Sequence, residues 1–258
     1  MAHIPRKRFG QHFLSHPNII HHLVRAIDPR PDDRLVEIGP GLGALTEPLL
    51  EHTRHLTVIE LDRDLVAHWR AHPQAGQLTV VEGDALAFDF SALGENLRLV
   101  GNLPYNISTP LLFHLATFSP QLKDAHFMLQ KEVVDRMVAE PATRDYGRLS
   151  VMLQYLFHMD ALMDVPPEAF TPPPKVMSSV VRLIPKAPAE RHARDESRFA
   201  FLVSQAFSQR RKMLRSTLKG HVPEAVFARL GIDTARRAET LTLDEFVGLS
   251  NESPGAAD

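Results

Sequence analysis

Short apolar runs recur along the first two thirds of the chain, each about five residues long and rich in valine, isoleucine and leucine. Runs of this kind are typical of strands that are buried on both faces of a sheet. The sequence predicts such strands over 35–39, 56–60, 78–82, 97–101 and 125–130, with a last one over 176–185. Helical spacing marks the stretches 44–52, 63–71 and 108–118 between them, as well as 17–27 and 148–157. Because strand and helix alternate at intervals of about 20 residues, the pattern predicts an α/β fold with a parallel sheet and helices on both faces.

The pattern changes after a polar segment at 186–196. Apolar runs of helical spacing follow over 199–207, 210–218, 223–230 and 243–249, and none of them is strand-like. We therefore expect a small all-helical C-terminal domain over 191–258, after an α/β domain over 1–190.

Composition excludes several classes of protein. The 258 residues are 44% hydrophobic and 23% charged, as in an ordinary globular protein. The lack of cysteine excludes disulfides, thiolate metal sites and a cysteine nucleophile. No run approaches the roughly 18 apolar residues of a membrane-spanning helix, and the basic N-terminus lacks the apolar core of a secretory signal. We expect a cytoplasmic protein with no membrane and no metal partner.

The net charge of −2 conceals a strong segregation of charge. Ten of the 29 basic residues lie in two stretches without any acid, 1–27 and 197–223, which leaves 19 basic against 31 acidic residues elsewhere. Segregation of this kind favours a local surface for a polyanion. The alternative is a solvated helix beginning near Gln209, whose arginines lie over the α/β domain. The candidate contacts to such a polyanion are Arg6, Lys7, Arg8, Arg210, Arg211, Lys212 and Arg215.

Several polar or glycine residues end consecutive strands. Gly39 and Gly41 form a G-x-G-x-G turn, which lets the backbone approach a nucleotide-like ligand but is a poor dinucleotide fingerprint. Glu60 stands where an acid can bond both hydroxyls of a ribose, or it is a solvated acid at a strand end. Asp84 can accept from the exocyclic amine of an adenine, or it is a turn aspartate.

The sequence Asn102-Leu103-Pro104-Tyr105 ends the fourth predicted strand. An amide oxygen and a nearby main-chain carbonyl that accept from an adenine N6 amine would favour a pyramidal, more nucleophilic nitrogen. Pro104 biases Leu103 toward an extended conformation, and Tyr105 supplies a face on which an extruded base can stack. A simple turn explains each residue singly, but the combination favours a pocket for a base.

The motifs RKRFGQHFL, VEIGPGLGALTEPLL, VIELDRDL, EGDAL, VGNLPYNISTPLLFHL, FMLQKEVVDRM, YGRLSVMLQY, AFTPPPKVMSSVVRLIP and FSQRRKMLRSTL together resemble the KsgA-type small-subunit ribosomal RNA adenine N6,N6-dimethyltransferases. The resemblance runs from about residue 6 to residue 250. It implies a Rossmann-like methyltransferase sheet that uses S-adenosyl-L-methionine and dimethylates two adjacent adenosines near the 3′ end of 16S RNA. It also implies immature 30S subunits as the partner of a monomeric enzyme, and a role in late subunit assembly.

Carried over position by position, the resemblance sets the cofactor against His12, Leu14, Gly39, Gly41, Glu60, Asp84 and Asn102. It sets the target adenine against Asn102, Leu103, Pro104 and Tyr105. Phe170 is either a second stacking face or a core phenylalanine. His12 is a departure, because the family usually has asparagine there. One ring nitrogen can replace the asparagine hydrogen bond, so we expect binding to survive and to weaken at low pH.

Three alternatives remain open. A large-subunit ribosomal RNA adenine methyltransferase of the macrolide-resistance type shares the fold, the cofactor and the Asn-x-Pro-Tyr motif, but the motifs TPPPKVMSSVVRL and QRRKMLRSTL match the small-subunit enzymes. A dehydrogenase is disfavoured by the glycine spacing. A ribosome-assembly factor without activity is disfavoured by the intact Asn-Leu-Pro-Tyr sequence.

Overall fold

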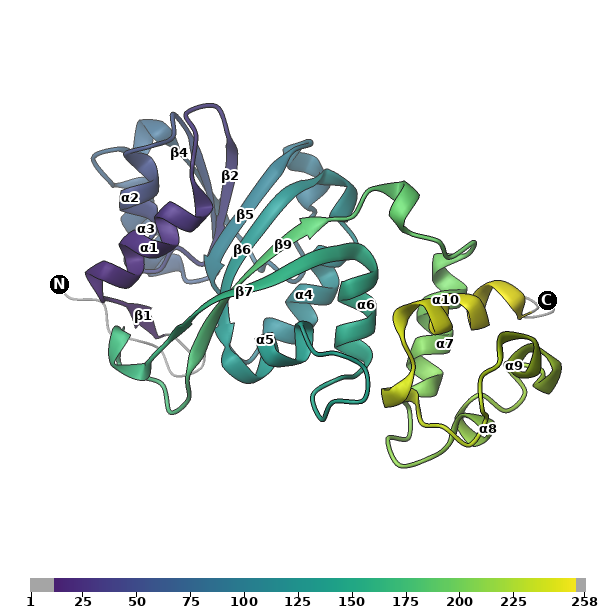
Figure 1. The fold of residues 1–258 in the computed structure, drawn as a ribbon. Helices are drawn as coiled ribbons and strands as arrows, with labels where there is room; N and C mark the ends of the chain where they lie inside the picture. Colours follow the sequence, from purple (N-terminus) through teal and green to yellow (C-terminus); the bar gives the residue numbers. More distant parts are fainter. Residues whose placement is uncertain (1–11, 254–258) are drawn as a thin grey trace. The chain divides into compact units, whose positions relative to one another are not determined.

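The computed structural model describes residues 12–253, and its largest feature is a mixed sheet of seven strands in the order β4-β3-β2-β5-β6-β9-β7 (Figure 1). The strands are β2 (Arg34–Ile38), β3 (Leu56–Glu60), β4 (Leu78–Glu82), β5 (Leu97–Asn102), β6 (Leu122–Gln130), β7 (Phe157–Val165) and β9 (Ser178–Pro185). Neighbouring strands from β4 to β6 are parallel, whereas β9 is antiparallel to β6. The six strands expected from the sequence are confirmed. The sheet is not wholly parallel, and β7 was not expected.

The order of the strands reverses between β2 and β5. From β2 the chain proceeds to β3 and β4 in one direction, and it then returns to the other side of β2 to form β5 and β6. Right-handed crossovers in opposite directions place their helices on opposite faces of a sheet. Accordingly, α2 (Thr46–Leu50) and α3 (Arg63–Arg70) cover one face and α4 (Ser108–Ala116) covers the other (Figure 1). Open α/β sheets bind ligands at such a switch point, outside the carboxyl ends of the strands.

A second, very small sheet lies beside this edge. In it, β1 (Phe13–Leu14) pairs antiparallel with β8 (Phe170–Thr171). Helix α1 (Pro17–Ile27) follows β1, and its C-terminal end is tied to the main sheet by the buried Arg98 of β5. The Arg98 guanidinium donates to the Ile27 and Asp28 carbonyls and to the carboxylates of Asp33 and Asp124. The segment is thus attached to the small sheet before α1 and to the main sheet at the C-terminal end of α1.

Contacts divide the chain into two compact units. The first comprises residues 1–134 and 159–185, and the second comprises 135–158 and 186–258. Helix α5 (Lys131–Met137) enters the second unit, whose other helices are α6 (Arg148–Leu156), α7 (Glu196–Ala206), α8 (Leu214–Thr217), α9 (Glu224–Leu230) and α10 (Leu243–Glu252). This division differs from a single boundary at residue 190. The reason is that Tyr155 of α6 packs on Phe199 of α7, with 4.5 Å between ring centroids.

The helix expected over 210–218 is much shorter, since α8 begins only at Leu214. Leu214 and Leu218 are buried, whereas Arg210, Arg211 and Lys212 are exposed and lie in a turn. An amphipathic helix needs an apolar side chain on its inner face at each turn, and the polar residues before Leu214 do not supply one. Within residues 12–253, no helix is long and apolar enough to cross a membrane.

Candidate functional site

A pocket opens at the carboxyl ends of β2, β3, β4 and β5, where the order of the strands reverses. It brings together all the residues expected to contact the cofactor and, apart from Phe170, all those expected to contact the target adenine. Those that line it are His12, Leu14, Gly39, Gly41, Glu60, Asp84, Asn102, Leu103, Pro104 and Tyr105. Leu42 and Leu61 also line it and are exposed, so the pocket offers apolar walls to a ligand. Apolar walls, a glycine turn and a few placed polar groups are what a nucleoside requires.

The glycine turn after β2 packs against Trp69 of α3. The indole Nε1 donates to the Gly41 carbonyl at 3.1 Å. Gly41 and Gly43 have φ angles of +56° and +95°, in the left-handed region that favours glycine. A Cβ atom at Gly43 would lie 2.7 Å from the Trp69 ring, so a side chain there would displace the indole. The turn can therefore present its backbone closely to a ligand.

Glu60, the last residue of β3, is buried and held by main-chain amides. Its Oε1 accepts from the amides of Leu61 and Asp62, each at 2.9 Å, and its Oε2 accepts from the Gly41 amide at 3.4 Å. Burial raises the pKa of the Glu60 carboxyl. The longest and weakest of these bonds is on Oε2, which makes that oxygen the one best able to accept from a ligand hydroxyl.

Glu37 is a polar residue of the pocket that was not expected from the sequence. It lies in β2, is 2% exposed, and accepts a hydrogen bond from the Thr46 hydroxyl at 2.7 Å. Burial, together with the nearby Glu60 carboxylate, raises the pKa of Glu37 to about 8. An acidic residue in an otherwise apolar strand, just before the glycine turn, is the signal that would have identified it. At neutral pH it retains a proton that it can donate.

We expect Glu37→Gln to change how stability depends on pH. Folded Glu37 keeps its proton up to about pH 8, whereas an unfolded glutamate loses it near 4.5. The protonated Glu37 thus makes a contribution to stability that is fully present below the unfolded pKa and is lost as the pH rises through the folded pKa. As the pH rises from 5 to 9, the free energy of unfolding of the wild type should therefore fall by about 2–4 kcal/mol relative to that of Glu37→Gln, as measured by urea unfolding. Parallel pH profiles for the two proteins would contradict this.

Asp84 follows β4 and fits both alternatives left open by the sequence. Its Oδ1 accepts from the Leu86 amide at 2.9 Å, which is the bond of a turn aspartate. The residue is also exposed and lines the pocket. The turn thus holds the carboxylate at the edge of the pocket.

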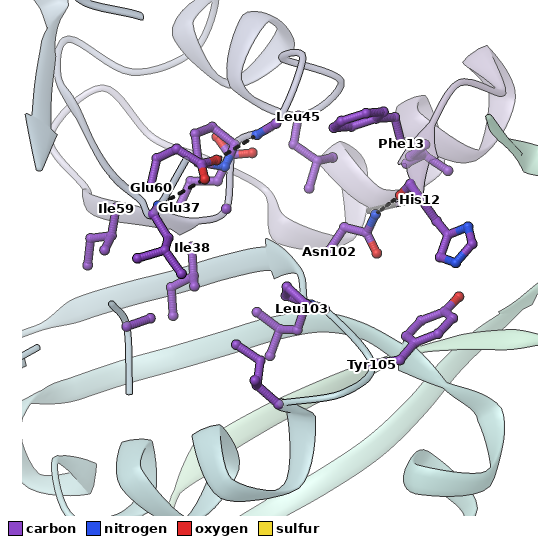
Figure 2. A pocket seen from close by; sticks show the side chains of 18 of the residues that line it. His12, Phe13, Glu37, Ile38, Leu45, Ile59, Glu60, Asn102, Leu103 and Tyr105 are labelled. Atoms are coloured by element: carbon purple, nitrogen blue, oxygen red, sulfur yellow. Dashed lines mark hydrogen bonds between the residues drawn. The ribbon is translucent and has the colours of Figure 1, made fainter. Parts of the chain in front are cut away.

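The amide of Asn102 has a defined orientation. Its Nδ2 donates to the His12 carbonyl at 2.8 Å, and Figure 2 shows Oδ1 on the side away from that carbonyl. Because a carbonyl oxygen only accepts hydrogen bonds, the group facing it must be the amide nitrogen. This leaves Oδ1 as the side-chain acceptor for a ligand.

The residues after Asn102 form an irregular turn beside the pocket. The Leu103 amide donates to the Met128 carbonyl at 3.0 Å, which fixes this turn to β6. The Pro104 carbonyl accepts from the Ile107 amide and the Ser108 hydroxyl at the start of α4. Of the two carbonyls, that of Leu103 is therefore the candidate acceptor for an adenine amine.

The Tyr105 ring lies against the His12 imidazole, with 5.6 Å between ring centroids and 25° between the planes (Figure 2). The His12 Nδ1 donates to the Pro172 carbonyl at 2.8 Å. Burial raises the pKa of the Tyr105 hydroxyl, so it stays protonated at neutral pH. Tyr105 therefore presents a neutral aromatic face at the pocket.

Phe170 and the basic residues lie elsewhere. Phe170 is 3% exposed and packs in the core of the first unit, and it is not among the residues that line the pocket, which favours the packing alternative. In the second unit, Arg210 donates to the Arg144 carbonyl and lies 3.7 Å from the Glu239 carboxylate. Arg211, Lys212 and Arg215 are exposed. Arg6, Lys7 and Arg8 lie outside the described residues.

Known proteins are similar to this chain in sequence and in fold. The sequence model of the family described as "Ribosomal RNA adenine dimethylase" matches residues 2–253. Proteins named "Ribosomal RNA small subunit methyltransferase A" are similar: that of Laribacter hongkongensis is 62% identical over 96% of both chains, and that of Dechloromonas aromatica is 57% identical over 97% of this chain and 98% of its own.

Two solved structures are similar in fold. A dimethyladenosine transferase from Plasmodium falciparum superimposes with a TM-score of 0.79 and 27% identity, over 92% of this chain and 96% of its own. The 23S rRNA methyltransferase ErmE superimposes with a TM-score of 0.72 and 26% identity, over 92% of this chain and 98% of its own. With a family match over nearly its whole length and relatives above half identity, this chain belongs to the ribosomal RNA adenine dimethylase family.

Proposed function

We propose that this protein transfers methyl groups from S-adenosyl-L-methionine to the N6 amines of two adjacent adenosines near the 3′ end of small-subunit ribosomal RNA. The observation that carries the proposal is that one pocket contains the carboxylate of Glu60, the glycine turn and the Asn102–Tyr105 sequence. High identity to proteins named as small-subunit methyltransferases supports the choice of RNA.

The residues of the pocket fit this cofactor. The Glu60 Oε2 would accept from the ribose, Asp84 would accept from the adenine amine, and the turn at Gly39 and Gly41 would contact the amino-acid portion. The exposed Leu61 supplies an apolar wall for the adenine ring. When bound, the cofactor supplies an electrophilic methyl group.

The chain's own contribution to the reaction is to prepare the amine. The N6 lone pair of adenine is delocalised into the ring and is a poor nucleophile. If the Asn102 Oδ1 and the Leu103 carbonyl accept from the two N6 hydrogens, they would favour a pyramidal nitrogen with a localised, more nucleophilic lone pair. Hydrogen-bond acceptors fixed in advance stabilise the positive charge that develops on nitrogen. Tyr105 holds the extruded base by stacking.

A large-subunit methyltransferase is the second candidate, favoured by the structural similarity to ErmE. The decisive experiment incubates the protein and labelled cofactor with immature 30S subunits, naked 16S RNA and naked 23S RNA, and maps the modified bases. We expect dimethylated adenosines near the 3′ end of 16S RNA, at the highest level in immature subunits. Methylation confined to 23S RNA would overturn the proposal. We also propose a monomeric, cytoplasmic enzyme that acts late in subunit assembly.

We further propose that the exposed turn containing Arg211 and Lys212 contacts RNA phosphates. Arg211→Ala/Lys212→Ala should bind small subunits more weakly than the wild type. The slope of log K against log salt concentration should be smaller in magnitude by about two, and the affinity for the cofactor should be unchanged. The extended variant that adds Arg210→Ala also removes the bond to Arg144, so the double variant is the cleaner test.

The matched control is Arg229→Ala, which removes an exposed arginine of the same unit that is already paired with Glu252 at 3.1 Å. It should bind subunits as the wild type does. Equal subunit affinity of the double variant and Arg229→Ala across a salt titration would move the RNA surface elsewhere.

A further inference from the structure

The buried hydroxyl of Ser178, the first residue of β9, bonds the side chain of Tyr105. The side chain is 0% exposed, and its Oγ shares a 2.5 Å hydrogen bond with the Tyr105 hydroxyl. Its neighbour Ser179 is equally buried, at 1% exposed, and donates to the Met163 carbonyl at 3.1 Å. Ser179 satisfies the main chain within the sheet, whereas Ser178 bonds a side chain that borders the pocket.

A second contact, with the His12 imidazole, also holds the Tyr105 ring. The His12 imidazole lies against its face, and the Pro172 carbonyl anchors that imidazole through Nδ1. Pro172 and Ser178 lie at the two ends of the loop that joins β8 to β9. This loop therefore determines both the position of the ring's hydroxyl and that of the ring stacked on it.

Local structure does not fix the plane of this ring. Tyr105 lies in a turn between β5 and α4, where the backbone sets the Cα position but leaves rotation about the side-chain bonds. The ring is half-buried at the edge of an open pocket, so packing encloses only part of it. The hydrogen bond at the far end of the side chain fixes the direction of the ring's long axis, and the His12 ring against its face restrains rotation about that axis, before a base arrives.

We propose that Ser178 is a positioning residue for methyl transfer, whose hydroxyl holds the far end of the Tyr105 ring in the place where the target adenine stacks. The inference rests on the proposed function. A stacked base transmits any tilt of the ring to its N6 amine, and small displacements of a reacting atom slow transfer steeply. The competing explanation is that the bond only satisfies a buried hydroxyl, in which case its loss would lower stability and leave the rate unchanged.

The test compares Ser178→Ala with Ser179→Ala, two buried serines that are adjacent in sequence. Single-turnover transfer to unmethylated small subunits is measured at saturating cofactor, together with cofactor affinity and the melting temperature. Ser178→Ala should transfer about tenfold more slowly, whereas Ser179→Ala should be within twofold of the wild type. Both should bind the cofactor normally.

A double-mutant cycle shows whether Ser178 acts through Tyr105. Tyr105→Phe removes the other half of the bond and should slow transfer by the same factor. The combined variant should be no slower than either single one. Multiplicative losses, or a normal rate for Ser178→Ala, would overturn the inference. If the wild type itself does not methylate small subunits, the proposed function fails instead.

Discussion

Asn102→Ala should reduce methyl transfer by a factor on the order of 10² to 10³ at saturating cofactor, measured in a single turnover. The variant loses the Oδ1 acceptor for the N6 amine. It also loses the bond from Nδ2 to the His12 carbonyl, which orients that oxygen. Because the resemblance also places this residue near the cofactor, binding of S-adenosyl-L-methionine should be measured beside the rate.

Asn102→Asp separates the two functions of the amide. Aspartate keeps an acceptor but sets a carboxylate oxygen against the His12 carbonyl, so the side chain should turn and most of the activity should be lost. A near-normal rate for Asn102→Ala at saturating cofactor would show that this turn is not the pocket for the target base. A normal rate for Asn102→Asp alone would show that orientation by His12 is unimportant.

Glu60→Ala should weaken binding of S-adenosyl-L-methionine by about 100-fold or more in calorimetry. Charge-assisted hydrogen bonds to the ribose hydroxyls are each worth about 1.5–3 kcal/mol, and the alanine cannot accept them. Glu60→Gln is the more conservative variant, because it keeps the shape of the side chain and one acceptor oxygen. We expect its affinity to be intermediate.

Glu82→Ala provides the matched control for Glu60. Glu82 ends β4 directly opposite Glu60 in the register of the two strands, and its carboxylate pairs with Arg63 and Arg70 outside the pocket. Its replacement should leave cofactor affinity unchanged. If Glu60→Ala binds within threefold of the wild type while remaining folded, Glu60 does not contact the cofactor.

The sequence could predict the strands from β2 to β6 because each contains a short, largely apolar run with a polar or glycine residue at or just after its carboxyl end. The same rule identified Glu60, Asp84 and Asn102, since the ends of parallel strands meet at one edge of a sheet. This rule did not identify Glu37, because Glu37 lies within β2, one residue before its end, and the rule concerns only residues at or just after the end of an apolar run.

Long-range pairings of very short elements could not be predicted. β1 and β8 have two residues each and lie more than 150 residues apart, so neither carries a periodic signal of its own. The burial of Phe170 follows from that pairing. Likewise, the bond between Tyr105 and Ser178 joins elements that the sequence separates by 73 residues.

Trp69 gives the folded protein an optical property. It is the single tryptophan among 258 residues, it is fully buried, and its indole nitrogen bonds the Gly41 carbonyl of the turn that borders the pocket. The indole emission of the whole chain thus originates from one site directly beneath the ligand-facing backbone. The protein carries an intrinsic fluorophore next to its pocket, and occupancy of the turn can be followed in solution without attaching a label.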